Sequence, residues 1–204
     1  MNTATHDSTS SSTTTPAVRY EPFTPIHKAV RRTLFETAML LGRTDFASPA
    51  ETASAERAVG ACFDLLREHA EHEDRHVVPV VAGFDPALGQ ALMVDHPRLE
   101  RAAIAVDSLW PRLPPADVPT RVRLGGELRR RFHAFVAMQL EHMNREENEV
   151  TEVLWANLSD AELMAISGRI IASIPPARMA EWVDLMLPVL SRPEREAMAA
   201  AKAA

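Results

Sequence analysis

Apolar residues recur every three or four positions along most of this chain, which is the period of amphipathic α-helices. The pattern predicts four long helices, over about 25–41, 49–81, 86–110 and 118–155. For the second of them, Ser48, Pro49 and Glu51 supply an N-cap, a proline in the first turn and a capping-box carboxylate. A proline-rich turn over 111–115 separates the third helix from the fourth.

The connections between these helices are short, so successive helices must be neighbours that run in opposite directions. We therefore predict that residues 21–157 form an all-α, antiparallel up-down four-helix bundle. Residues 1–20 are predicted to be a disordered tail, because ten of the first 15 residues are Ser or Thr and show no apolar period. Residues 158–204 are predicted to form additional C-terminal helices that begin at a capping box from Ser159 and at Pro175. Their apolar stripe is expected to pack on the bundle or on a second subunit, as a homodimer.

The composition agrees with a globular helical protein: 46% of the residues are hydrophobic, only 5% are aromatic, and there are 7 glycines. A net charge of -6 argues against a nucleic-acid partner. No apolar run is long enough to cross a membrane, and the first fifteen residues do not resemble a secretory signal. The single cysteine, Cys62, excludes an intrachain disulfide and a thiolate cluster, and we expect it to be a buried apolar residue of a cytoplasmic protein.

One motif occurs in both the second and the fourth predicted helix. It consists of a histidine followed four residues later by a glutamate, as His69 with Glu73 and as His142 with Glu146. Residues four apart lie one helical turn above each other, so each pair can direct an imidazole and a carboxylate to the same place. Such a pair suits a metal ion.

The first and third predicted helices each contain one further candidate ligand, His27 and His96. Four imidazoles and two carboxylates suit a pair of first-row metal ions that the carboxylates can bridge. Two octahedral ions need about twelve coordination positions, and these side chains fill about eight. Open positions therefore remain for a small ligand, while zinc or manganese is also compatible with the donors.

This order of motifs, a lone histidine and a His-x-x-x-Glu pair repeated twice on successive helices, resembles the hemerythrin-like proteins, also called the HHE cation-binding family. The likeness covers about residues 22–157 and includes the acidic pairs at 73–74 and 146–147. It implies a di-iron centre, with two iron ions as cofactor, that binds or senses dioxygen, nitric oxide or iron. The metal ligands that it implies are His27, His69, Glu73, His96, His142 and Glu146.

The chain departs from the oxygen-carrying hemerythrins of marine invertebrates at three points. Those proteins have a second histidine in the third helix, where this chain has Glu100. They have a carboxylate five residues after the last histidine, and here Glu147 at that position competes with Glu146. Pro97 disfavours helical geometry at His96, so either the helix kinks there or His96 starts a helix. These differences favour sensing or redox chemistry over reversible oxygen transport.

Other residues near the motifs have less specific roles. His76 follows the first motif by one turn and could join the metal shell or donate a proton, whereas His72 is expected at the helix edge. The remaining neighbours, expected as apolar core that could also line a ligand pocket, are Leu34, Phe135 and Met138.

No flavin fingerprint, electron-donor motif or substrate pocket accompanies the candidate site in the sequence. We therefore predict a binding or sensing protein for a diatomic ligand, and we assign no catalytic residue. Two alternatives remain: a di-iron oxidoreductase that consumes peroxide or nitric oxide, and a signalling module in which metal stabilises the bundle and the helices after Ser159 contact a partner. Mononuclear or structural zinc also remains open.

Overall fold

A computed structural model describes residues 19–203, so positions 1–18 of the predicted disordered tail lie outside the described residues. The described part is helical and contains no strand, which confirms the all-α class. The α-helices are α1 (Thr24–Arg43), α2 (Pro49–His76), α3 (Val78–Phe84), α4 (Pro86–Asp107), α5 (Val118–Arg145), α6 (Thr151–Asn157), α7 (Asp160–Ser173), α8 (Pro176–Met186) and α9 (Arg192–Ala203). Three short segments complete the list: the 3₁₀ turns η1 (Trp110–Arg112) and η3 (Leu187–Val189), and the π-helical turn η2 (Glu146–Val150).

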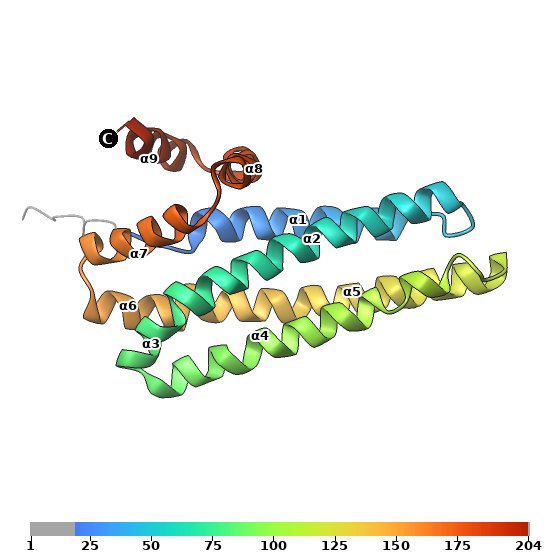
Figure 1. Cartoon of the computed structure of the whole chain (residues 1–204), viewed down its shortest axis with the longest axis horizontal. Helices are drawn as coiled ribbons and strands as arrows, with labels where there is room; N and C mark the ends of the chain where they lie inside the picture. Colours follow the sequence, from blue (N-terminus) through green and yellow to red (C-terminus); the bar gives the residue numbers. More distant parts are fainter. Residues whose placement is uncertain (1–18, 204) are drawn as a thin grey trace, which may run out of the picture.

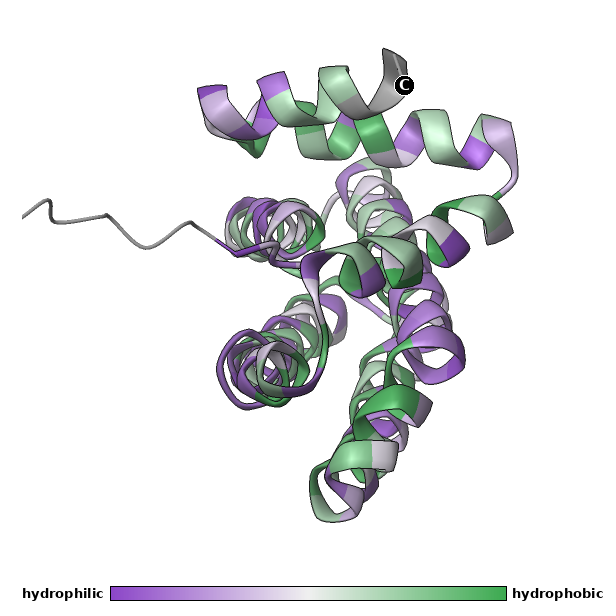
Figure 2. Cartoon of the chain, turned by 90° about the vertical axis from the view of Figure 1, so that its left-hand side faces the viewer, coloured by the Kyte–Doolittle hydropathy of each residue, from purple (hydrophilic) through white to green (hydrophobic). Residues whose placement is uncertain are grey.

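The four long helices α1, α2, α4 and α5 lie side by side along the long axis of the molecule (Figure 1). Helix α1 contacts α2 and α5, and α4 contacts the same two helices, so the contacts close into a ring. The short helices α3 and α6 contact each other at one end of this ring. Each long helix carries both hydrophilic and hydrophobic residues, as its amphipathic pattern requires (Figure 2).

The second predicted helix is divided into two. Helix α2 ends at His76, and α3 begins at Val78, although one helix was expected to continue to about 81. Pro79 explains the division, because it has no N–H to donate to the carbonyl of Arg75 and its ring crowds that carbonyl. The proline therefore falls in the first turn of a new helix, where it is tolerated.

The third predicted helix is continuous through its proline. Helix α4 begins at Pro86 and passes through Pro97 without a break, so the expectation that His96 could start a helix is wrong. Asp85 begins α4 instead, because its carboxylate accepts a hydrogen bond from the backbone N–H of Leu88 at 2.9 Å. His96 consequently lies in the interior of a long helix.

The predicted caps form, one of them only in part. Ser159 and Glu162 make a complete capping box at the start of α7. At the start of α2, Ser48 accepts a hydrogen bond from the N–H of Glu51 at 3.3 Å, as expected. The carboxylate of Glu51, however, accepts from the N–H of Asp45 at 2.9 Å and not from that of Ser48. It therefore ties the preceding loop to the helix.

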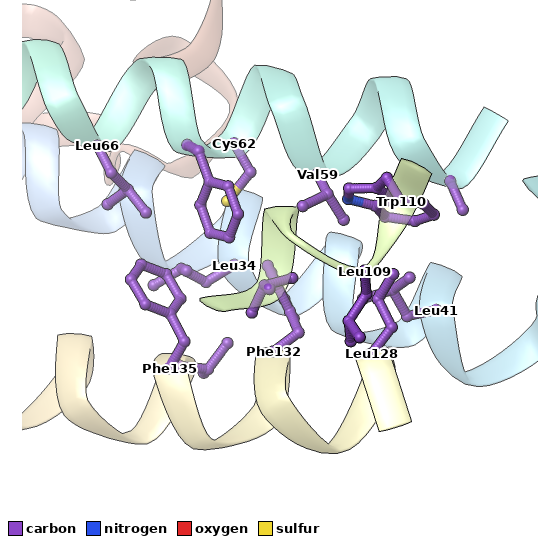
Figure 3. Close-up of a cluster of buried hydrophobic side chains, with 14 of the residues drawn as sticks. Leu34, Leu41, Val59, Cys62, Leu66, Leu109, Trp110, Leu128, Phe132 and Phe135 are labelled. Carbon is purple, nitrogen blue, oxygen red and sulfur yellow. The ribbon is translucent and has the colours of Figure 1, made fainter. Parts of the chain in front are cut away.

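Two apolar clusters occupy different levels of the ring of long helices. The first apolar cluster fills the half nearest the loops at 44–48 and 108–117, and Figure 3 shows part of it. Its largest members include Leu34, Phe63, Trp110, Leu128, Phe132 and Phe135. Cys62 also lies in it, fully buried as predicted, and burial raises the pKa of its thiol to about 12. The second apolar cluster contains Phe23, Val77, Leu92, Val150 and Leu163 among others.

The C-terminal extension packs on the long helices, which was one of the two predicted alternatives. Helix α7 contacts α2, and it places Leu163 and Ile166 in the second apolar cluster. Helix α8 crosses the long helices steeply, contacts α1 and buries Trp182 in the first apolar cluster (Figure 1). Helix α9 lies beyond the last helix that the sequence pattern predicted.

The start of the described chain is fastened to the extension. Arg19 forms an ion pair with Asp160 at 3.0 Å, and the hydroxyl of Tyr20 donates to Ser167 at 2.9 Å. These two residues, which were predicted as part of the tail, are therefore held against α7. Among the residues that the structure describes, no helix combines the length and apolar character needed to cross a membrane.

Candidate metal centre

The six side chains predicted to bind metal come together between the two apolar clusters, and each is at most 8% exposed. Helix by helix, they are His27 from α1, His69 and Glu73 from α2, His96 from α4, His142 from α5 and Glu146 from the start of η2. On α1, for example, Phe23 of the second cluster precedes His27 and Val30 of the first follows it. On α2 the sequence order is reversed: Leu66 of the first cluster precedes His69 and Glu73, and Val77 of the second cluster follows them. The polar layer is therefore enclosed by apolar side chains at both ends.

The ligand atoms fall into two sets, and within each set all atoms lie within 4.8 Å of one another. The first site consists of His27, His69, Glu73 and Glu146. The second site consists of Glu73, His96, His142 and Glu146. Both carboxylates belong to both sites, so each site could hold one metal ion with the two carboxylates shared.

The two sites have nearly the same internal geometry. The Nε2 atoms of His27 and His69 lie 3.1 Å apart in the first site, and those of His96 and His142 lie 3.0 Å apart in the second. Within each helical pair, Nε2 of His69 lies 3.1 Å from Glu73 Oε1, and Nε2 of His142 lies 3.2 Å from Glu146 Oε1. The similarity follows from the repeated motif, since the same four-residue spacing on a helix gives the same separation.

Each carboxylate also turns one oxygen towards each site. Oε1 of Glu73 lies near the two histidines of the first site, while its Oε2 lies 3.6 Å from Nε2 of His96. Glu146 is arranged in the opposite sense, with Oε1 near His142 and Oε2 at 3.4 Å from Nε2 of His27. This is the arrangement that carboxylates bridging two cations require.

Several oxygens of these carboxylates lack hydrogen-bond partners. Both oxygens of Glu73 and Oε2 of Glu146 are buried, and none of the three accepts a hydrogen bond within the described residues. A buried, unpartnered ionised carboxylate costs several kcal/mol, on the order of the desolvation of a charge. Metal cations at the two sites would supply the missing partners, so the donor set fits a pair of ions.

The pKa values of the metal-free site reflect this concentration of charge. Burial, together with the negative charge of Glu146, raises the pKa of Glu73 to about 7. Burial opposes the charge of His27, but its contacts with Glu147 and Glu73 prevail and raise its pKa to about 9. For His69, burial and the neighbouring imidazoles lower the pKa. Without metal, the site therefore holds protons on some of its imidazoles.

Outside the centre, carboxylates lie within hydrogen-bond distance of the far nitrogens of two histidines and near that of a third. Nδ1 of His27 lies 2.9 Å from Glu147 Oε1, and Nδ1 of His96 lies 2.7 Å from Asp74 Oδ1. Nδ1 of His142 has no hydrogen-bond partner, and the nearest carboxylate oxygen, on Asp95, is 3.6 Å away. Sequence reasoning noticed the acidic pairs at 73–74 and 146–147 but did not assign these contacts.

The π-helical turn η2 accounts for the use of two consecutive glutamates. Glu146 reaches the centre, and the next residue, Glu147, reaches His27 on the neighbouring helix α1. The hydroxyl of Thr151 donates to the carbonyl of Glu146 at 3.0 Å, which satisfies a backbone group inside the wider turn. Glu147 therefore does not replace Glu146 in the sites but contacts a histidine from outside.

The remaining candidates lie away from the two sites. Glu100 is exposed and is in neither set of ligand atoms. His133, which was not expected to be a ligand, is also exposed and outside both sets. His72 packs edge-on against Trp182 of α8, with ring centroids 5.6 Å apart. Nε2 of His76 is buried without a hydrogen-bond partner but is in neither set of ligand atoms.

A small cavity lies on the outer side of His142, between α4 and α5. Its volume is about 20 Å³, which is enough for a single water molecule. Its lining includes His142, whose Nδ1 has no hydrogen-bond partner, and the ion-paired Asp95 and Arg145. Met138 lines the same cavity, whereas Leu34 and Phe135 belong to the first apolar cluster.

The C-terminal extension is attached directly beside the first site. Lys28 and Glu68, the chain neighbours of its two histidines, both bind the extension. Lys28 Nζ contacts Glu194 of α9 at 2.6 Å. Glu68 accepts hydrogen bonds from Arg178 at 2.7 Å and from the indole of Trp182 at 3.2 Å, both on α8.

No protein-family model matches the chain, and no match to a curated protein was found. The functional proposal consequently depends on the pattern of histidines and glutamates and on the geometry in which the fold places them.

Proposed function

We propose that this chain is a hemerythrin-like protein, in which an antiparallel up-down four-helix bundle holds two metal ions, and that the ions are iron. On this proposal the protein binds or senses dioxygen, nitric oxide or iron. The observation that carries it is the pair of four-residue sites that share Glu73 and Glu146. A single structural zinc ion would need only one such set and would leave the other imidazoles unused.

The roles of the residues follow from their positions. His27 and His69 would hold the first ion, His96 and His142 the second, and the two glutamates would bridge them. When bound in the ferrous state, the iron pair supplies the electrons that a diatomic ligand accepts. The two apolar clusters lie at both ends of the polar layer and would limit competition from water for the positions that a diatomic ligand needs.

The first test is the metal content of protein purified without added metal and after anaerobic loading with ferrous iron. We expect two ions per chain and an absorption spectrum that differs between the air-exposed and reduced protein. His69→Ala should lose both properties. His133→Ala, which changes an exposed histidine outside the site, is the matched control. Zinc alone, or no metal after reconstitution, would contradict the proposal.

The second test separates binding from turnover, because the di-iron oxidoreductase remains the alternative. Nitric oxide and dioxygen are added in turn to the reduced, iron-loaded protein, with and without an excess of reductant. A binding or sensing protein forms an adduct in proportion to its sites. An oxidoreductase continues to consume the ligand as long as reductant lasts.

A further inference from the structure

The carboxylates outside the two sites differ in their own ionic surroundings. Glu147, which contacts His27 of the first site, is also held by Arg31, with distances of 2.5 Å and 2.9 Å to its two oxygens. Asp74, which contacts His96 of the second site, forms no ion pair with a lysine or arginine of the described chain. One histidine in each site is therefore backed by a carboxylate, and only one of these carboxylates is neutralised.

Such a contact affects the metal-binding nitrogen on the other side of the ring. A carboxylate that accepts a hydrogen bond from Nδ1–H keeps the proton on that nitrogen and leaves the lone pair of Nε2 free for a metal ion. It also makes the imidazole a stronger donor. Nε2 of both His27 and His96 points towards the centre, at 3.1 Å and 3.0 Å from the partner imidazole.

The net charge of the groups that contact the imidazoles from outside differs between the two sites. At the first site, Glu147 and Arg31 sum to zero. At the second site, Asp95 is paired with Arg145, and Asp74 adds one uncompensated negative charge. Asp74 is about half exposed, so solvent reduces the effect without changing its sign.

We propose that Asp74 and Glu147 are positioning residues that hold His96 and His27 as Nε2 donors, and that the uncompensated Asp74 makes the second site bind its ion more tightly than the first. This inference rests on the proposed function, since it concerns the order in which the two sites fill. It predicts stepwise loading, with His96 and His142 occupied first.

The experiment is an anaerobic titration of the metal-free full-length protein with Co²⁺, followed by absorption and by calorimetry. The wild type should show two resolved binding steps. Asp74→Asn retains a hydrogen-bond acceptor but removes the charge, and it should weaken the tighter step by about 10-fold and bring the two steps together. Glu71→Gln, an exposed change on the same helix, is its matched control.

Two further variants test the first site from opposite directions. Glu147→Gln should weaken the looser step by about 10-fold and widen the gap between the steps. Arg31→Gln leaves the charge of Glu147 uncompensated and should tighten metal binding at the first site. If the pair of Arg31 and Glu147 only stabilised the structure, the same change would weaken binding instead. Glu152→Gln, another exposed glutamate beyond the site, is the control for both.

A spectroscopic readout checks the hydrogen bonds themselves. In the zinc-loaded protein, ¹⁵N NMR should find His27 and His96 protonated at Nδ1, and each signal should shift in the variant of its own carboxylate. The inference is wrong if wild-type protein binds two ions but Asp74→Asn and Glu147→Gln titrate like their controls, or if both steps weaken equally. Wild-type protein that binds fewer than two ions contradicts the proposed function as well.

Discussion

The same four helices build two very different interiors at two levels. In the first apolar cluster, part of which Figure 3 shows, the facing side chains are mainly leucine, valine and phenylalanine. Phe63, for example, packs against Phe132 and Phe135. One or two turns away, the corresponding inward positions carry imidazoles and carboxylates. The apolar level gains free energy when it is buried, whereas the polar level is costly to bury without a cation. Stability and metal binding are therefore separated along the helix axis.

The largest expected change in stability comes from a substitution in the first apolar cluster that leaves the polar level intact. Phe132 is fully buried and contacts two other phenylalanines, so Phe132→Ala should lower the free energy of unfolding by about 3–5 kcal/mol. Chemical denaturation of the metal-free protein measures this loss. At a temperature where the variant stays folded, it should still take up two metal ions. Loss of metal binding in the folded variant would show that the two levels are not separable.

The stability of the metal-free protein and its affinity for metal should depend on pH in opposite directions. Despite the opposing effect of burial, nearby carboxylates raise the pKa of His27 to about 9 and that of His142 to about 8 in the metal-free protein. A raised histidine pKa stabilises the metal-free fold fully below the ordinary value of 6.5, and this stabilisation is lost as the pH rises through 8 to 9. Metal binding must displace these protons, so its affinity should instead rise over the same range.

Thermal melting and metal titration at pH 6, 7.5 and 9 test both directions at once. One displaced proton changes the affinity by about 10-fold per pH unit, or about 1.4 kcal/mol. Calorimetry in buffers of different ionisation enthalpy counts the protons released. An affinity that is constant over this range would mean that the histidines of the metal-free protein are already neutral.

Removal of one buried charge should stabilise the metal-free protein while it damages the site. Both oxygens of Glu73 lack hydrogen-bond partners and its pKa is raised to about 7, so above about pH 7 the metal-free protein holds this carboxylate ionised at its full cost in stability. Glu73→Gln should therefore increase the metal-free stability at pH 8 by about 1–2 kcal/mol. The same change should prevent the binding of two ions. Glu71→Gln should alter neither quantity, and a destabilised Glu73→Gln protein would refute the argument.

The smallest effect concerns the extension. The ion pair of Lys28 with Glu194 is partly exposed, and such pairs contribute about 0–1 kcal/mol. Lys28→Ala should therefore change the melting temperature slightly and the metal content not at all. Arg32→Ala, which removes an exposed ion pair within α1, is the matched control. A variant that loses metal would show that the extension supports the site more strongly than its contacts indicate.

Much of the fold follows from periodic patterns that depend on neighbours along the chain. The helical stripes, the caps at Ser48 and Ser159 and the two pairs of a histidine and a glutamate four residues apart are all local signals at fixed spacing. The predicted end of the second helix, at about 81, was wrong, because α2 ends at His76. Pro79 did not decide the matter in the sequence, since a proline in an apolar run can either end a helix or begin a new one. Pro97 shows the other outcome, a proline inside a continuous helix.

Contacts between distant segments could not be predicted in this way. Asp74 lies 22 residues before His96, and Glu147 lies 120 residues after His27, so no spacing rule connects them. Their pairing depends on which helices are neighbours and on how each is rotated. The attachment of the extension beside the first site has the same origin, since Glu68 and Trp182 are 114 residues apart.

The π-helical turn sets the rotational phase of everything that follows the metal site. Each residue of an α-helix advances by about 100°, so in an uninterrupted helix Val150 and Leu154 would face about 80° and 120° away from His142. The turn absorbs one extra residue and returns both towards the inner side, where they are buried in the second apolar cluster. One continuous stretch of chain can thereby serve both the metal ligands and the closing apolar layer. Because the turn already holds the extra residue, deleting a single residue from 147–150 should convert it to ordinary α-helix and keep α6 and the extension in register with the site, whereas inserting one more residue there would rotate both by about 100°.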